Sequence, residues 1–97
     1  MILESKKVPV KGKELDFFKI NLGRAPLLVL VAPRGFVMCG YLDIEACQKL
    51  QDTACRVKGV KGWEDFLEAN IESLTSSARE LGIEIGMKVK EALPLLI

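Results

Sequence analysis

The stretch APLLVLVAPRGFVMCG, residues 25–40, carries the strongest structural signal in this chain of 97 residues. Its two runs, Pro26–Ala32 and residues 36–40, have apolar side chains at nearly every position, so each is apolar on both faces of a strand. Central strands have this pattern because both of their faces are buried. The Pro-Arg-Gly sequence between the runs favours a turn. We therefore expect two antiparallel strands in the middle of a sheet.

The segments before this stretch resemble a β-hairpin. Residues 2–10 and 15–22 are the two expected strands, and Gly12 in the turn at residues 11–14 is able to adopt a positive φ. Phe17 and Phe18 are adjacent, so they point to opposite faces of the second strand.

The segments after it alternate between short helices and one strand. Asp43 is suited to cap a helix, because its carboxylate can accept hydrogen bonds from free backbone N–H groups. We expect a strand at residues 53–60 and helices at residues 62–69, 75–83 and 87–93, the last closed by Pro94. The whole chain, residues 1–97, is thus expected to be a single α+β domain. Residues 1–41 form its β-rich, oligomerising part, and residues 42–97 are mainly helical.

The composition favours a soluble, cytosolic protein. The apolar stretches are much shorter than the roughly 20 residues of a membrane span, and the start of the chain is polar by Ser5. The formal net charge is +1, yet four lysines crowd the first strand and its turn. A basic cluster can bind nucleic acid, but lysines on a solvated hairpin also discourage edge-to-edge pairing, and no nucleic-acid motif accompanies them. The lysines are Lys6, Lys7, Lys11 and Lys13.

The cysteines do not have the spacing of a metal site. Cys39, Cys47 and Cys55 include no close pair, and the chain has no histidine, so we expect neither a metal nor a cofactor. The lack of histidine also removes every Cys-His arrangement for nucleophilic catalysis. Cys47 and Cys55 are expected in the core. Cys39 has two interpretations: a small core residue, or a thiol that lines a pocket and reacts.

Three places are candidates for binding a small anionic ligand. Cys39 and the following Gly40 end an apolar strand, where ligand sites often gather. Arg34 and Gly35 lie in a loop that can hold an anion. A helix opens at Thr75 and Ser76, where hydroxyls and free N–H groups can hold a phosphate or carboxylate. The ordinary alternatives are a core cysteine, a solvated turn and helix capping.

Self-assembly is the firmest functional expectation from the residues. Apolar residues make up 49% of a chain whose small size limits how much apolar surface it buries alone. Strands that are apolar on both faces need cover on both, and the few short helices can supply it on one. We therefore expect a homo-oligomer, with a tetramer slightly favoured. The expected interface residues are Phe17, Phe18, Leu27 and Val29.

Three segments, taken in order and spacing, resemble a known family. They are GFVMCGYLDIEACQKL at residues 35–50, GVKGWEDFLEA at residues 59–69 and LTSSARELGIEIGMKVKEAL at residues 74–93. Together they resemble the archaeal and bacterial domain-of-unknown-function family numbered 1805. Asp43 and Gly62 depart from the Asn and Thr typical of the family, and each is still suited to cap a helix. The resemblance implies an α+β fold whose amino-terminal β region takes part in subunit assembly, and it implies no reaction.

Three functional hypotheses follow, and the enzymatic one is disfavoured. The first is a homo-oligomeric assembly or small-ligand-binding module without catalytic activity. The second is a thiol-dependent enzyme that uses Cys39 on a small anionic substrate, steadied by Arg34 or a helix start. The third is a weak nucleic-acid binder that uses the amino-terminal lysines.

Overall fold

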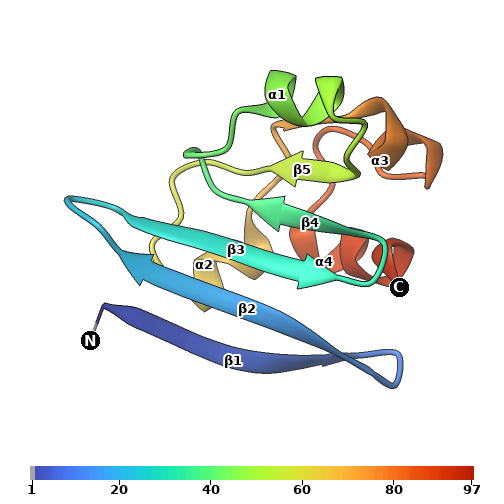
Figure 1. Ribbon diagram of the computed structural model, residues 1–97. Coiled ribbons are helices and arrows are strands. Elements are labelled where there is room, and N and C mark those ends of the chain that lie inside the picture. The colour runs from blue at the N-terminus through green and yellow to red at the C-terminus, as the bar shows by residue number, and fades with distance from the viewer. Residues whose placement is uncertain (1) are drawn as a thin grey trace.

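Residues 2–97, which the computed structural model describes, form an α+β fold around a six-stranded sheet in which the strands lie in sequence order (Figure 1). The first four strands are antiparallel to one another in turn, β5 runs parallel to β4, and β6 is antiparallel to β5. The strands are β1 (Leu3–Val10), β2 (Lys13–Asn21), β3 (Pro26–Ala32), β4 (Gly35–Met38), β5 (Ala54–Arg56) and β6 (Ser73–Leu74).

Short helices connect the later strands. Helix α1 (Ile44–Lys49) lies in the crossover between β4 and β5, as a parallel pair requires, whereas α2 (Trp63–Glu68) and α4 (Val89–Ala92) lie behind the sheet in Figure 1. Helix α3 (Ser76–Glu80) follows β6, and a 3-10 helix, η1 (Leu93–Leu96), ends the fold.

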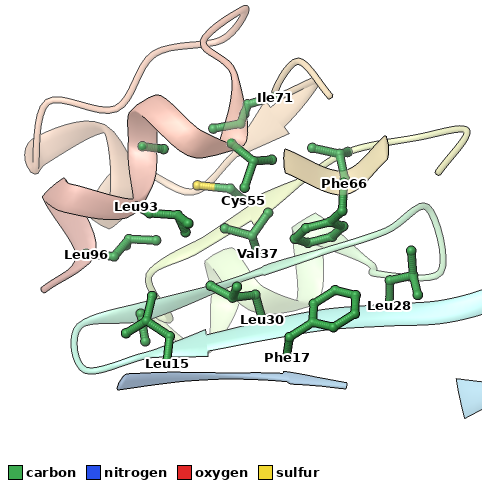
Figure 2. Close-up of a cluster of buried hydrophobic side chains, with 14 of the residues drawn as sticks. Leu15, Phe17, Leu28, Leu30, Val37, Cys55, Phe66, Ile71, Leu93 and Leu96 are labelled. Atoms are coloured by element: carbon green, nitrogen blue, oxygen red, sulfur yellow. The ribbon is translucent and has the colours of Figure 1, made fainter. Parts of the chain in front are cut away.

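The main core lies between the sheet and the helices α2 and α4. Alternate residues of β2, β3 and β4 point into it, so that Leu15, Phe17, Leu28, Leu30 and Val37 share one face and are all buried (Figure 2). From the helical side the core receives Phe66, Ile71, Leu93 and Leu96.

The β-rich half agrees closely with the sequence-based expectation. The hairpin β1–β2 is present, and its turn is tighter than predicted, because Lys11 and Gly12 both adopt positive φ and β2 begins at Lys13. The central pair β3–β4 is antiparallel, with Val29 opposite Met38. The α+β class and the β-first order are thereby confirmed.

The elements of the helical half are mostly of the expected type, but several are shorter than predicted. The expected strand at residues 53–60 is reduced to β5, and β6 was not predicted. Helix α3 is shorter than predicted, but Thr75 is its cap, and Gly82 adopts the expected positive φ after it. Pro94 does not stop the coil: it occupies the first turn of η1, where its missing N–H is not needed.

Asp43 caps α1 as predicted, with its carboxylate accepting hydrogen bonds from the backbone N–H groups of Glu45 and Ala46. Cys39, Cys47 and Cys55 are free and buried. No helix within residues 2–97 is long and apolar enough to cross a membrane.

Candidate functional site

One face of the sheet is apolar and is not covered by α2 and α4, which pack on the other face (Figures 1 and 2). Because side chains alternate between the two faces along a strand, the neighbours of the core residues point outward. In the middle of the sheet Val31 is 44% exposed, and at its edge Leu3 is 49% exposed. We call this surface the open apolar face. Its residues are Leu3, Phe18, Ile20, Leu27, Val29, Val31, Phe36 and Met38.

The register makes the open apolar face continuous across four strands. Phe18 on β2 lies opposite Val29 on β3, and Val29 lies opposite Met38 on β4. A second row joins Leu3, Ile20 and Leu27. Such cross-strand neighbours have touching side chains, so the surface is one patch rather than scattered apolar residues.

Of the four residues expected at a subunit interface, three lie on this face: Phe18, Leu27 and Val29. Phe17 does not. Its side chain is 3% exposed and packs edge-on against Trp63, with ring centroids 4.7 Å apart, and against Phe66 at 5.5 Å. Phe17 is therefore a core residue of its own chain, because α2 covers the face to which it points.

A cavity of about 310 Å³ opens at the end of the sheet where β3 begins and β4 ends. Because β4 and β5 are parallel, the loops that follow them leave from the same end of the sheet. Residues of both loops line the cavity. We call it the β4–β5 cavity. Its main lining residues are Pro26, Cys39, Gly40, Tyr41, Val60 and Lys61.

Cys39 belongs both to the core and to the wall of this cavity. The residue is only 4% exposed, and its Sγ accepts a hydrogen bond from the Leu28 N–H at 3.3 Å. The thiol in turn donates a long, weak hydrogen bond to the Pro26 carbonyl, with 4.0 Å between sulfur and oxygen. Most of the sulfur is thus occupied by its own chain, and only a small part faces the cavity.

A sequence model of DUF1805, a domain of unknown function, matches residues 38–96, which include β4's last residue and nearly all of the helical half. The chain belongs to this family. It is 31% identical over 90 residues to the uncharacterised protein YunC of Bacillus subtilis (strain 168), covering 89% of each chain. Its fold matches the crystal structure of TA1206 from Thermoplasma acidophilum, a protein of unknown function, with a TM-score of 0.94 and 36% identity. That match covers 98% of this chain and 93% of the other.

The segment matched to DUF1805 contains most of the β4–β5 cavity but little of the open apolar face. Cys39, Tyr41 and Lys61 lie inside it, whereas Phe18 and Val29 lie before it. The two surfaces of this DUF1805 member therefore come largely from different parts of the sequence, although they adjoin where Pro26 precedes Leu27 and Met38 precedes Cys39.

Arg34 and Gly35 do not join Cys39 in one site. They precede β4, and Cys39 follows it, so the strand separates them. Arg34 is exposed, and its backbone N–H donates to the Leu96 carbonyl at 2.9 Å. Gly35 has a packing role, because a Cβ there would collide with the carbonyl oxygen of Thr53.

The polar groups of Thr75 and Ser76 are already used within the chain. Thr75 is 1% exposed, and its Oγ1 accepts from the backbone N–H groups of Ala54 and Ala78. The Ser76 N–H donates to the Gln48 side-chain oxygen at 2.7 Å, and the Ser76 hydroxyl accepts from the amide nitrogen of Gln48 at 2.8 Å. Gln48, from α1, therefore already engages the Ser76 groups that the anion site expected at this helix start would use.

The amino-terminal lysines do not form one patch. Lys6 points to the core side of β1, where its ammonium lies 5.1 Å from the Trp63 ring centroid. Lys7 points to the opposite face and forms an ion pair with Asp16. Adjacent strand positions face opposite ways, which divides the basic cluster seen in the sequence.

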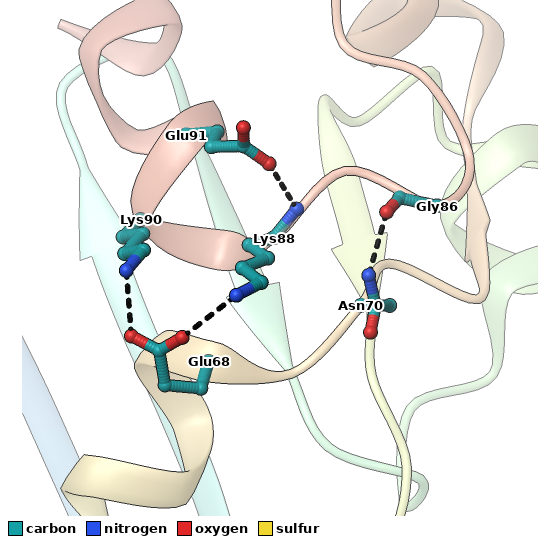
Figure 3. A network of polar contacts seen from close by, with 6 residues as sticks. All are labelled: Glu68, Asn70, Gly86, Lys88, Lys90 and Glu91. Carbon is teal, nitrogen blue, oxygen red and sulfur yellow. Dashed lines mark hydrogen bonds and ion pairs between the residues drawn. The ribbon is translucent and has the colours of Figure 1, made fainter.

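Other charged side chains form ion pairs with one another and do not converge on a shared binding site. Glu68 contacts Lys88 at 3.0 Å and Lys90 at 2.8 Å (Figure 3), and the hydrogen bonds from Lys90 and then Lys88 lower the pKa of its carboxyl. Nearby, the Lys88 N–H donates to Glu91, and Asn70 donates to the Gly86 carbonyl. Within the described part of the chain, no group of three or more His, Cys, Asp or Glu residues is arranged to hold a metal.

Sequence reasoning missed Tyr41 and Lys61 as cavity residues. Tyr41 is 53% exposed, and its hydroxyl donates to the Ala25 carbonyl at 3.2 Å, which holds the ring at the cavity. Both lie in segments that resemble the family, but neither belongs to a motif with an assigned chemical role. The parallel pairing of β4 and β5 would have pointed to both, because it brings the two loops together.

Proposed function

We propose that this DUF1805 member is a homo-oligomeric module that assembles through the open apolar face. The observation that carries the proposal is the continuous row Phe18–Val29–Met38 across three neighbouring strands. These three residues are half-buried, and a contiguous, partly exposed apolar surface of this kind is typical of a protein–protein interface, because its burial removes apolar area from water.

A second copy of the same chain is the partner that best fits this face. Packing of two such faces about a twofold axis brings identical apolar surfaces together, the isologous arrangement commonest in oligomers. The ion pair between Lys7 and Asp16 lies on this face, in the same cross-strand row as Val31, and its two charges balance each other. Charge repulsion between two copies is therefore small.

A second surface supports the tetramer. Within the described chain β1 is an edge strand that pairs only with β2, so the backbone of Leu3–Val10 has one free side. Edge strands of two copies can pair with each other. One twofold contact between open faces and another between β1 edges generate a closed tetramer with dihedral symmetry when the two axes intersect at right angles.

Light scattering coupled to size-exclusion chromatography at low micromolar concentration tests the proposal. The unmodified chain is expected to have a multiple of the monomer mass, and Phe18→Asp or Val29→Asp is expected to lower it. Leu50→Asp is the matched control, because Leu50 is 73% exposed at the end of α1 and is not one of the residues of this face, so the variant should keep the parent mass. A monomer mass for the unmodified chain with native circular dichroism would contradict the proposal.

A further inference from the structure

The β4–β5 cavity has mostly apolar walls. The Pro26 ring, the Tyr41 ring and the Val60 side chain supply them, and Gly40 leaves space because no side chain projects from it. Its volume of about 310 Å³ lies at the low end of the range for small-molecule sites. The shape thus suits a compact apolar group such as one ring or a branched alkyl chain.

The cavity also lies where the fold places a crevice. Chain leaving β4 leads to α1, and chain leaving β5 leads to α2, so the two connections diverge beyond the parallel strand ends. In open sheets, crevices outside the carboxyl ends of parallel strands are frequent ligand sites. Cys39 at its wall already has hydrogen-bond partners, so it offers polarisable sulfur surface to a ligand rather than an unmet polar group.

Among the described residues, Lys61 is the one charged residue that lines the cavity. It also lies beside Glu64 and Asp65 on the neighbouring surface, and its backbone N–H donates to the Asp65 carboxylate at 3.2 Å. Its ammonium forms no ion pair within residues 2–97. In contrast, the nearby Lys58 is paired with Glu72 at 3.5 Å. None of the lining residues in the described chain is acidic.

We propose that the β4–β5 cavity binds a small monocarboxylate with an apolar body. The body packs against Pro26, Tyr41 and Val60, and the carboxylate pairs with the Lys61 ammonium. A monoanion fits better than a phosphate, because the lining supplies one mobile cation rather than the several donors that a phosphate needs. The site is separate from the open apolar face, so binding does not depend on assembly.

Titration with benzoate, followed by ¹⁵N–¹H NMR, tests this site. Millimolar benzoate is expected to shift the backbone amides of Cys39, Gly40 and Lys61, whereas neutral benzamide and the small anion acetate bind more weakly. Equal affinity for benzoate and benzamide would overturn the anion assignment. The absence of shifts at the cavity, or shifts confined to another surface, would overturn the site.

Two variants and their matched controls separate the two halves of the proposal. Lys61→Gln is expected to weaken benzoate binding by about fivefold to tenfold while leaving benzamide binding unchanged; Lys49→Gln, on α1, changes neither. Ala25→Phe fills the cavity mouth and is expected to abolish binding of both probes, whereas Ala46→Phe, on the exposed side of α1, retains it. Retained binding in Ala25→Phe with native spectra elsewhere would overturn the proposed location.

Discussion

Phe18 on β2 lies directly across from Val29 on β3, on the face of the sheet opposite α2 and α4. Its neighbour Phe17 points the other way and packs edge-on against Trp63 and Phe66. Two adjacent residues of one type therefore belong to two different environments, the core of the chain and its open apolar face.

Alanine substitution of these two residues should have different consequences. Phe17→Ala leaves a cavity beside Phe66 and is expected to lower the free energy of unfolding by about 3–5 kcal/mol. Phe18→Ala is expected to weaken self-association instead, visible as a mass that falls on dilution. Urea unfolding and light scattering over a concentration series measure both effects. Equal losses of stability in the two variants, with unchanged mass, would contradict the assignment of faces.

Thr75 is expected to matter for stability and not for ligand binding. Thr75→Val keeps the shape of the side chain but removes the oxygen that accepts from the N–H groups of Ala54 and Ala78. Because these donors are buried, we expect a loss of about 2 kcal/mol in urea unfolding. Ser76→Ala is the comparison, since its exposed hydroxyl has only the Gln48 partner, and it should lose less. A Thr75→Val chain as stable as its parent would show that the cap is dispensable.

The Cys39 thiol should react slowly in the folded protein. Its side chain is 4% exposed and its sulfur is engaged by the Leu28 N–H, so an alkylating reagent needs local opening to reach it. Iodoacetamide labelling at neutral pH, read by peptide mass spectrometry, should be much faster in urea than in buffer. Cys39→Ala should cost about 1 kcal/mol of stability through lost packing. Rapid native labelling with little stability change would favour the alternative of a thiol-dependent enzyme.

Stability should fall at alkaline pH because of Cys55. Burial raises the pKa of this thiol from 9.0 to about 12. Between these values the folded state keeps the proton and the unfolded chain releases it, so the unfolded state binds fewer protons and stability declines as pH rises. The contribution is complete below about pH 9 and falls above it by at most about 1.4 kcal/mol per pH unit.

Urea unfolding at intervals from neutral to alkaline pH measures this slope. Other parts of the chain also respond to alkaline pH, so the informative quantity is the difference from Cys55→Ala, in which they are retained. The Cys55→Ala variant should be less stable than the parent chain at neutral pH, and its stability should fall less steeply as the pH rises. Parallel slopes for the two chains would mean that the Cys55 proton does not contribute.

The amino-terminal lysines should be dispensable for folding. Their replacement by Gln is expected to leave circular dichroism unchanged, since Lys6 and Lys7 are exposed on opposite faces of β1. Fluorescence anisotropy with random RNA and DNA should show no salt-sensitive binding at micromolar protein. Salt-sensitive binding that the replacements remove would favour the nucleic-acid alternative. The replaced residues are Lys6, Lys7, Lys11 and Lys13.

The sequence by itself determined the local structure of this protein. The apolar runs around residues 25–40 indicated paired central strands, and Asp43 marked the start of α1. These features depend on neighbours in the chain: a cap needs N–H groups two or three residues away, and strand pattern is read from consecutive side chains. The α+β class was predictable for the same reason.

The tertiary structure alone decided which face each side chain joins. Period-two alternation assigns Phe17 and Phe18 to opposite faces but does not say which is the core, because that depends on where α2 packs. Strand β6 has two residues, too few for an alternating pattern of side chains, and it forms a strand because it pairs with β5. Likewise, Gln48 meets Ser76 and the loop after β4 meets the loop after β5 only when distant segments are brought together. Such contacts are set by the packing of the whole chain, so no short stretch of sequence encodes them.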